Sequence, residues 1–165
     1  MTATLTLPYP ISANRYWSNY VLPGSKRALQ GPSVEAKRYK RLVSQLAMAA
    51  GMRPTMANVE VELILHPKAP KDAAKRERIE GPHWHLNVRC LDVDNCVKVA
   101  LDALEGVAFA NDDQILTLIV NRGMPTPNGA LFVRVAHVDA LKSYPAAPQM
   151  GLAFEDESDP LAEVA

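Results

Sequence analysis

The chain has 165 residues, of which 48% are hydrophobic and 22% charged, as is typical of one soluble globular domain that folds without disulfides or a structural metal. Acidic and basic residues number 18 each, but five acidic and no basic residues lie in the last 15 positions, so residues 1–150 carry a net charge of +5. No apolar run reaches the roughly 18 residues of a membrane helix and no secretory leader is recognisable, which predicts a cytoplasmic protein with no membrane partner.

The N-terminal part predicts one strand followed by a long irregular stretch. Residues 3–7 alternate polar and apolar side chains, as a strand does, and a proline ends the pattern. A second proline keeps the next segment irregular, and its Asn14-Arg15-Tyr16 cluster indicates a loop held in a fixed place. Residues 22–32, rich in glycine and proline, predict a connection without regular structure.

A helix and a second strand are predicted next. Ser33 is placed to cap a helix that Gly51 ends, and apolar side chains recur between them at helical spacing. The opposite face carries three basic residues, normally a sign of a solvent-facing surface and sometimes of phosphate contacts: Lys37, Arg38 and Arg41. Residues 59–66 alternate and predict a strand.

Residues 67–89 are polar and irregular, which predicts a mobile basic loop, before residues 86–91 resume a strand-like pattern. Four soft ligands lie in and after this loop: His83, His85, Cys90 and Cys96. They are a candidate zinc set, but their spacing matches no zinc finger, so an arrangement without metal is favoured.

The C-terminal part predicts one more helix and two strands. The helical period returns from Asp94 and stops at Gly106. Residues 115–120 and 131–138 predict two strands, which an Asn-Gly turn would join as antiparallel partners.

Together the elements predict an α/β mixed (α+β) fold in which two main helices pack on a single small mixed sheet. We expect one domain over residues 1–143, with the basic loop 67–89, and an acidic, disordered tail over residues 144–165.

Two pairs of aspartates surround the last predicted helix in the stretch LDVDNCVKVALDALEGVAFANDDQI, residues 91–115. Asp92 and Asp94 lie where a strand meets the helix, and residues two apart in an extended segment point to the same side. The helix continues this polar side as a stripe formed by Asp94, Lys98 and Asp102. We expect a short return after the helix to bring Asp113 back beside Asp92, so that three carboxylates converge near an ammonium group.

Carboxylates crowded in this way repel one another unless a cation neutralises them, and a hard divalent ion such as magnesium is the usual solution. Such a site suits phosphodiester hydrolysis, with Lys98 stabilising the charge that develops on the phosphate. The alternative is structural, because Asp92 is placed to cap the helix and Asp112-Asp113 to form a turn.

The same stretch resembles the signature of the RusA family of Holliday junction resolvases: an Asp-x-Asp-Asn-x-x-Lys helix start, an Asp-Ala-Leu segment and an Asp-Asp-x-Gln-[Ile/Val] turn. The opening LTLPYPISANRYW is similar to the family's N-terminal strand and its Pro-x-x-x-Asn-[Arg] loop. The resemblance covers roughly half of the chain.

The resemblance implies a homodimeric endonuclease, bacterial or phage-encoded, that binds four-way branched DNA and makes paired symmetric nicks in recombination and repair. It implies Mg2+ as cofactor, with Mn2+ able to substitute. Asp92, Asp94 and Asp113 match the metal-binding catalytic aspartates, and Lys98 matches the essential lysine. Three further residues of the motif would surround the site: Asn95, Asp102 and Asp112.

One departure concerns DNA contacts, because the family often has an arginine run directly before the first aspartate, where this chain has Cys90 and Leu91. We expect the basic loop and the N-terminal loop to supply the contacts instead, through Asn14, Arg15, Lys68, Lys71, Lys75, Arg76, Arg78 and Arg89. Two other functions stay open: a non-catalytic DNA-binding module of the same fold, and a metal-dependent phosphoesterase acting on nucleotides or RNA.

Overall fold

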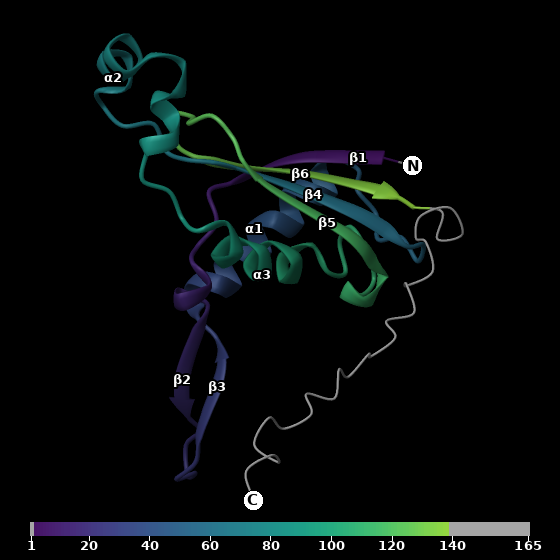
Figure 1. Cartoon of the computed structure of the whole chain (residues 1–165). Coiled ribbons are helices and arrows are strands. Elements are labelled where there is room, and N and C mark those ends of the chain that lie inside the picture. Colours follow the sequence, from purple (N-terminus) through teal and green to yellow (C-terminus); the bar gives the residue numbers. More distant parts are fainter. Residues whose placement is uncertain (1, 139–165) are drawn as a thin grey trace, which may run out of the picture.

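A computed structural model describes residues 2–138, which form a four-stranded mixed sheet with helices packed on one face (Figure 1). The strands, in the sheet order β1-β6-β4-β5, are β1 (Thr2–Pro8), β6 (Ala130–His137), β4 (Val59–His66) and β5 (Ile115–Arg122). β6 pairs antiparallel with both β1 and β4, whereas β4 and β5 run parallel. The predicted α+β class, with one small mixed sheet, is therefore confirmed.

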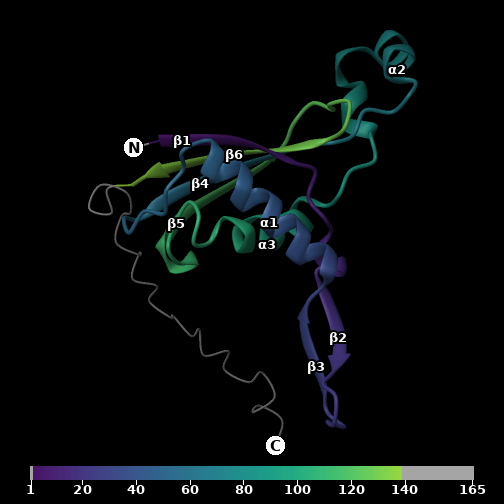
Figure 2. The ribbon, with the colours of Figure 1, turned by 180° about the vertical axis from the view of Figure 1, so that it is seen from behind.

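Two helices cover the same face of the sheet: α1 (Val34–Ala49) and α3 (Val93–Leu104). Figure 2 shows α1 crossing this face, with α3 beside it. The alternation of β4 directs four fully buried side chains toward the helices: Val59, Val61, Leu63 and Leu65. On the opposite face Arg134 pairs with Glu60 at 2.6 Å and with Glu62 at 2.7 Å, so this face is polar. The core is thus a single layer between the sheet and the two helices.

Both main helices begin and end where the sequence predicts. The Ser33 hydroxyl accepts a hydrogen bond from the Ala36 backbone N–H at 3.1 Å, which caps α1. α1 and α3 are each followed by a glycine with positive φ, Gly51 (72°) and Gly106 (72°), a conformation that terminates helices with little strain.

Two elements replace predicted irregular segments. Residues 17–32 form a two-stranded hairpin of β2 (Trp17–Val21) and β3 (Ala28–Pro32). Part of the predicted basic loop forms the helix α2 (Ala73–Glu80), followed by the 3-10 helix η2 (Gly81–Asn87). Hence the prediction of a strand over residues 86–91 is wrong.

The predicted pairing of the last two strands is also wrong. β5 and β6 are not partners, because β4 lies between them and pairs with both. The seven residues that join β5 to β6 therefore step over one strand and do not close a hairpin. The Asn128-Gly129 turn is present within this connection, with φ +71° at Gly129.

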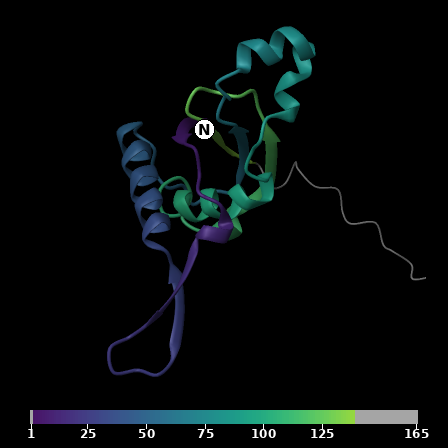
Figure 3. The same cartoon turned by 90° about the vertical axis from the view of Figure 1, so that its left-hand side faces the viewer.

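The β2–β3 hairpin and the α2 segment project in different directions from the body of the molecule (Figures 1 and 3). Both leave from the side on which α3 begins (Figure 1). Within residues 2–138, no helix combines the length and the apolar character needed to cross a membrane. The predicted acidic tail, 144–165, lies outside the described residues.

Candidate active site

Asp92 and Asp94 line one hollow of about 480 Å³ at the start of α3. Its other lining side chains come from residues 90–94 and from the C-terminal end of β5, including Asn121 and Arg122. We call it the acidic hollow. Arg122 donates hydrogen bonds to the backbone oxygens of Val88 and, at 3.4 Å, of His85. This arginine therefore connects the η2 segment to β5 beside the two carboxylates.

The Asp92 carboxylate is not used to cap α3. Asp92 occupies the N-cap position with an extended backbone, but in the described part of the chain its side chain makes no capping hydrogen bond. Its carboxylate instead accepts a hydrogen bond from Asn95 Nδ2 at 3.3 Å. Capping therefore does not account for this aspartate. Its side chain lines the hollow, where the carboxylate could bind a cation.

Lys98 lies one turn after Asp94 and has two kinds of partner. Its Nζ is 3.4 Å from Asp102, and it also lies 5.9 Å from the ring centroid of Tyr16 and 5.7 Å from that of Trp17. Burial, followed by a hydrogen bond to Asp102, raises the pKa of Tyr16 to about 12, so this phenol stays protonated and continues to donate to the carboxylate. Asp102 thus joins the lysine and the tyrosine.

A second hollow, of about 450 Å³, adjoins the acidic hollow and shares Cys90 and Leu91 with it. It is lined by three of the predicted DNA-contacting residues, and we call it the basic hollow: Arg15, Lys68 and Arg89. Residues far apart in the chain thus bring positive charge next to the carboxylate pair. Arg15 also forms an exposed ion pair with Glu35 at 2.9 Å.

Tyr9 fixes the short segment between the two hollows. Its hydroxyl accepts a hydrogen bond from the Leu91 backbone N–H at 2.8 Å and lies 3.6 Å from Cys90 Sγ. Burial raises the pKa of Tyr9 to about 12. Sequence reasoning missed this residue, because the PYP stretch contains no sign of a contact with a segment about 80 positions later.

The second pair of aspartates lies at the other end of the sheet. Asp113 belongs to the 3-10 helix η3 (Asp112–Gln114), directly before β5, whereas the acidic hollow touches the C-terminal end of that strand. From Ile115 to Asn121 the strand spans about 20 Å, at roughly 3.3 Å per residue. Across residues 2–138, no three histidine, cysteine or acidic side chains lie close enough together to hold a metal ion.

The prediction that Asp113 returns beside Asp92 within one chain is therefore wrong. α3 connects two parallel strands, so it must run from one end of the sheet to the other. Its 12 residues cover about 18 Å at 1.5 Å per residue, which separates Asp92, before the helix, from Asp113, after it.

The candidate zinc set does not assemble in the described residues either. The Cys96 thiol is buried in the core and donates to the Val93 backbone oxygen at 3.0 Å, and burial raises its pKa to about 11. His85 Nδ1 lies 3.0 Å from the Pro82 oxygen. Cys96 is thus a residue of the hydrophobic core.

Gln114, also missed from the sequence, attaches the turn that carries Asp112 and Asp113. Its buried side-chain oxygen accepts hydrogen bonds from the backbone N–H groups of Ala110 and Asn111, both at 2.8 Å. Its amide nitrogen donates to two backbone oxygens before β4: Thr55 at 3.0 Å and Ala57 at 2.9 Å.

The remaining predicted DNA contacts lie outside both hollows. Asn14 is in the 3-10 helix η1 (Ala13–Arg15) at the foot of the hairpin. Four basic residues lie on or just before the projecting α2: Lys71, Lys75, Arg76 and Arg78. Arg76 pairs with Asp72 at 3.1 Å, so part of this charge is neutralised locally.

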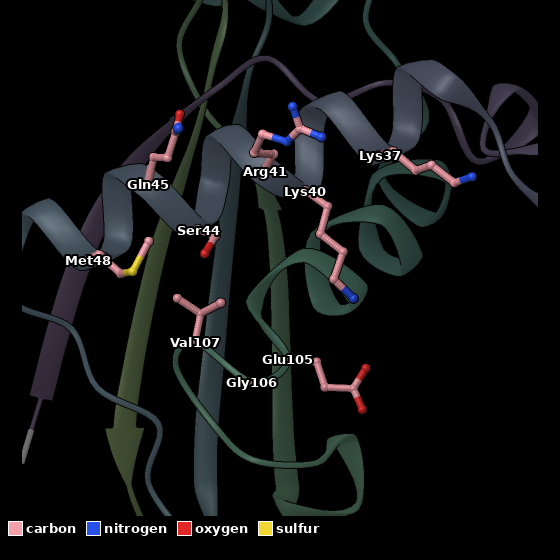
Figure 4. Close-up of a pocket in the computed structure, with 9 residues that line it drawn as sticks. All are labelled: Lys37, Lys40, Arg41, Ser44, Gln45, Met48, Glu105, Gly106 and Val107. Carbon is pink, nitrogen blue, oxygen red and sulfur yellow. The ribbon is translucent and has the colours of Figure 1, made fainter.

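A further hollow of about 600 Å³ lies between α1 and the loop after α3 (Figure 4). Lys37, Lys40 and Arg41 line it from α1, and Glu105 lines it from the facing loop. It sits at the C-terminal end of α3, away from Asp92 and Asp94, and includes one carboxylate. This surface suits phosphate contacts better than metal chemistry.

The residues of the acidic hollow fit a hard divalent ion. Magnesium is commonly held by one or two protein carboxylates, with waters and substrate phosphate oxygens completing the octahedron, and Asp92 and Asp94 supply that share. Manganese accepts the same oxygen ligands. Carboxylates that can hold an ion lie beside basic side chains that can bind phosphates. This arrangement is suited to phosphodiester hydrolysis.

Comparisons with known proteins agree with this chemistry. Residues 8–136 match the model of a protein family described as Endodeoxyribonuclease RusA. A curated relative, the crossover junction endodeoxyribonuclease rusA of Enterobacteria phage HK97, is 27% identical over 136 residues, which cover 82% of this chain and 94% of the relative. The family match spans both hollows, α3 and the Asp112-Asp113 turn.

Proposed function

The chain belongs to the RusA family of endodeoxyribonucleases, and on this premise we propose that it is a magnesium-dependent nuclease that resolves four-way DNA junctions by paired symmetric incisions during recombination and repair. The observation that carries the proposal is the contact between the two hollows. Asp92 and Asp94 line the acidic hollow, the basic side chains line the basic hollow, and Cys90 and Leu91 line both. The phosphates of a DNA strand bound by these basic side chains would lie beside the carboxylates.

Each residue of the site has a role in this proposal. Arg15, Lys68 and Arg89 bind phosphates that flank the cleaved bond. Asp92, oriented by Asn95, and Asp94 hold the ion, which when bound activates water and neutralises charge on the phosphate. The Lys98 ammonium group stabilises the additional negative charge of the transition state, and Asp102 with the Tyr16 and Trp17 rings holds it in place.

We further propose that the third carboxylate comes from a second copy of the chain. β5 is the last strand of the four-stranded sheet, and its Leu118 and Ile119 side chains are 39% and 36% exposed. A two-fold axis that crosses the middle of β5 runs the partner's β5 in the opposite direction. In such a dimer the partner's turn would lie beside the acidic hollow and would complete the three-aspartate site.

Cleavage of synthetic DNA tests the proposal. We expect a labelled four-way junction to be cut in Mg2+ or Mn2+, at symmetric positions, and the matching linear duplex and single strands to remain intact. Asp92→Asn should bind the junction with unchanged affinity yet fail to cut it. Asp72→Asn is a matched control, because Asp72 also occupies an N-cap without a side-chain capping bond but lies on the projecting α2. This variant should cut as the wild type does.

Other outcomes point to the two alternatives. Retained cleavage by Asp92→Asn, or cleavage in excess chelator, would remove the acidic hollow from the mechanism. Absence of cleavage together with no calorimetric heat on titration with Mn2+ would favour a non-catalytic DNA-binding module. Faster hydrolysis of RNA or nucleotides than of the junction would favour the other phosphoesterase class.

A further inference from the structure

The β2–β3 hairpin extends from the body of the molecule with little to pack against (Figures 1 and 3). All five residues of β2 are exposed, among them Trp17 at 43% and Tyr20 at 47%. An isolated two-stranded hairpin is at best marginally stable in water, and exposed large apolar side chains gathered on one element mark an interaction surface. The hairpin is therefore expected to be in contact with a partner when the protein works.

The charge of the segment favours a nucleic acid as that partner. The first 34 residues of the chain contain no acidic side chain, and the connection between the two strands carries Lys26 and Arg27. A polyanion is attracted to such a surface, whereas a protein partner would need an acidic patch of its own. The foot of the hairpin also adjoins the candidate active site, because Trp17 lies 5.7 Å from Lys98 Nζ.

Tyr20 has the form of a stacking platform. Its ring lies across Gly31 of the neighbouring strand, so closely that a Cβ atom at that position would come within 3.0 Å of the ring edge. Glycine thus lets the strand support one side of the ring, while nearly half of the side chain remains exposed. An aromatic ring supported in this way can stack on an unpaired base of any sequence.

We propose that the hairpin enters the open centre of branched DNA and that Tyr20 stacks on a base exposed at the branch point. This inference rests on the proposed function, since it names the part of the same substrate that the hairpin contacts. Lys26 and Arg27 pair with phosphates around the opening. Selectivity for branched over linear DNA then comes from the hairpin, because a continuous duplex exposes no base face to it.

A fluorescent base placed at the branch point measures the contact directly. Junctions with 2-aminopurine at the centre are bound in Ca2+, which replaces Mg2+ so that the DNA stays intact. We expect wild-type protein to change the 2-aminopurine fluorescence and Tyr20→Ala to leave it unchanged. Junction affinity should fall about 10-fold or more in this variant, the size expected for loss of one stacked base, while duplex affinity stays the same.

Three further variants separate stacking from other roles of the hairpin. Tyr20→Phe keeps the ring and should behave as the wild type. Gly31→Val keeps the tyrosine but displaces its ring, and should lower the fluorescence change and the junction affinity. Val21→Ser changes an apolar side chain that is 57% exposed and that the strand alternation places on the opposite face, and it should have little effect.

Each other outcome overturns the inference in a recognisable way. Equal losses on junction and duplex in Tyr20→Ala would make the hairpin a general DNA contact. Conversion of the protein to monomers, measured by analytical ultracentrifugation, would make the second copy its partner. If wild-type protein cuts junctions while Tyr20→Ala binds them with unchanged affinity and fluorescence, the hairpin inference alone fails. If wild-type protein neither prefers nor cuts junctions, the proposed function fails as well.

Discussion

Gln114 is the residue on which the geometry of the second aspartate pair depends. Its side chain makes four hydrogen bonds to backbone groups of two segments, residues 110–111 and 55–57, and it is the one buried polar side chain among the described residues. Removal of such a group leaves its partners without hydrogen bonds in a site that water does not easily reach. A single substitution there should therefore affect both stability and the position of the turn.

We predict that Gln114→Leu lowers the free energy of unfolding by about 3 kcal/mol, because buried hydrogen-bonding groups are left unpaired. Urea denaturation followed by circular dichroism measures the change. Gln30→Leu, at an exposed position of β3, should shift the unfolding free energy by no more than about 0.5 kcal/mol. A Gln114 variant as stable as the Gln30 variant would show that these hydrogen bonds contribute little.

Asp112 and Asp113 are alternative candidates for the third carboxylate of the proposed metal site. The family turn has the order Asp-Asp-x-Gln, whereas here Gln114 directly follows Asp113. The spacing between the two aspartate pairs, which resembles that of the family without a gap, selects Asp113, whereas alignment on the glutamine selects Asp112. We predict that Asp113→Asn abolishes junction cleavage and that Asp112→Asn lowers it by about 10- to 100-fold, since a residue beside the ligands contributes less than a ligand. The reverse order in single-turnover assays would assign the ligand to Asp112.

At the scale of elements, the helices and strands that bury one face were the ones predicted correctly from the sequence. α1, α3, β1 and β4 each bury one face, and the resulting periodic pattern identified all four within a residue or two. α2 buries no side chain and β2 buries none, so neither has a periodic pattern to recognise. The separation of β5 from β6 by β4 is a non-local pairing, which a local turn signal such as Asn-Gly does not encode.

α2 offers a test of how DNA is held, because it can be altered without touching the core. Its basic side chains lie on a projecting helix that has no buried residue. We predict that replacing Lys71, Lys75 and Arg78 with glutamine leaves the melting temperature unchanged and weakens junction binding. The dependence of log K on log salt should become shallower by about 0.9 for each phosphate that the variant no longer binds. Glu77→Gln with Glu80→Gln, on the same helix, should not weaken binding, and an unchanged slope in the triple variant would place DNA elsewhere.

At the scale of the whole molecule, the sequence predicted the parts of the candidate site better than their assembly. The spacing of Asp92 and Asp94 was enough to place them side by side, because neighbours in sequence share a local geometry. Tyr9, directly after β1, and Asn121 and Arg122, at the end of β5, complete the two hollows and carry no local signal. The predicted position of the third aspartate was wrong for a topological reason. A helix that connects two parallel strands holds the residues before it and after it apart by the length of the helix.

A mixture of two inactive variants tests whether the carboxylates meet across two chains. Asp92→Asn is combined, by unfolding and refolding together, with a double variant, Asp112→Asn with Asp113→Asn. A site built from both copies is then intact once in every mixed dimer, because one chain supplies its wild-type Asp92 and the other its wild-type turn. A site built within one chain is intact in neither.

The substrate for this mixture is a supercoiled plasmid that extrudes a cruciform. Wild-type protein should cut both strands and produce linear DNA, whereas each variant alone should leave the plasmid supercoiled. We predict that the mixture produces nicked circles with little linear DNA, since a mixed dimer holds one working site and paired incision needs two. A mixture as inactive as its components, with mixed dimers verified by differently tagged chains, would contradict a site shared between two chains.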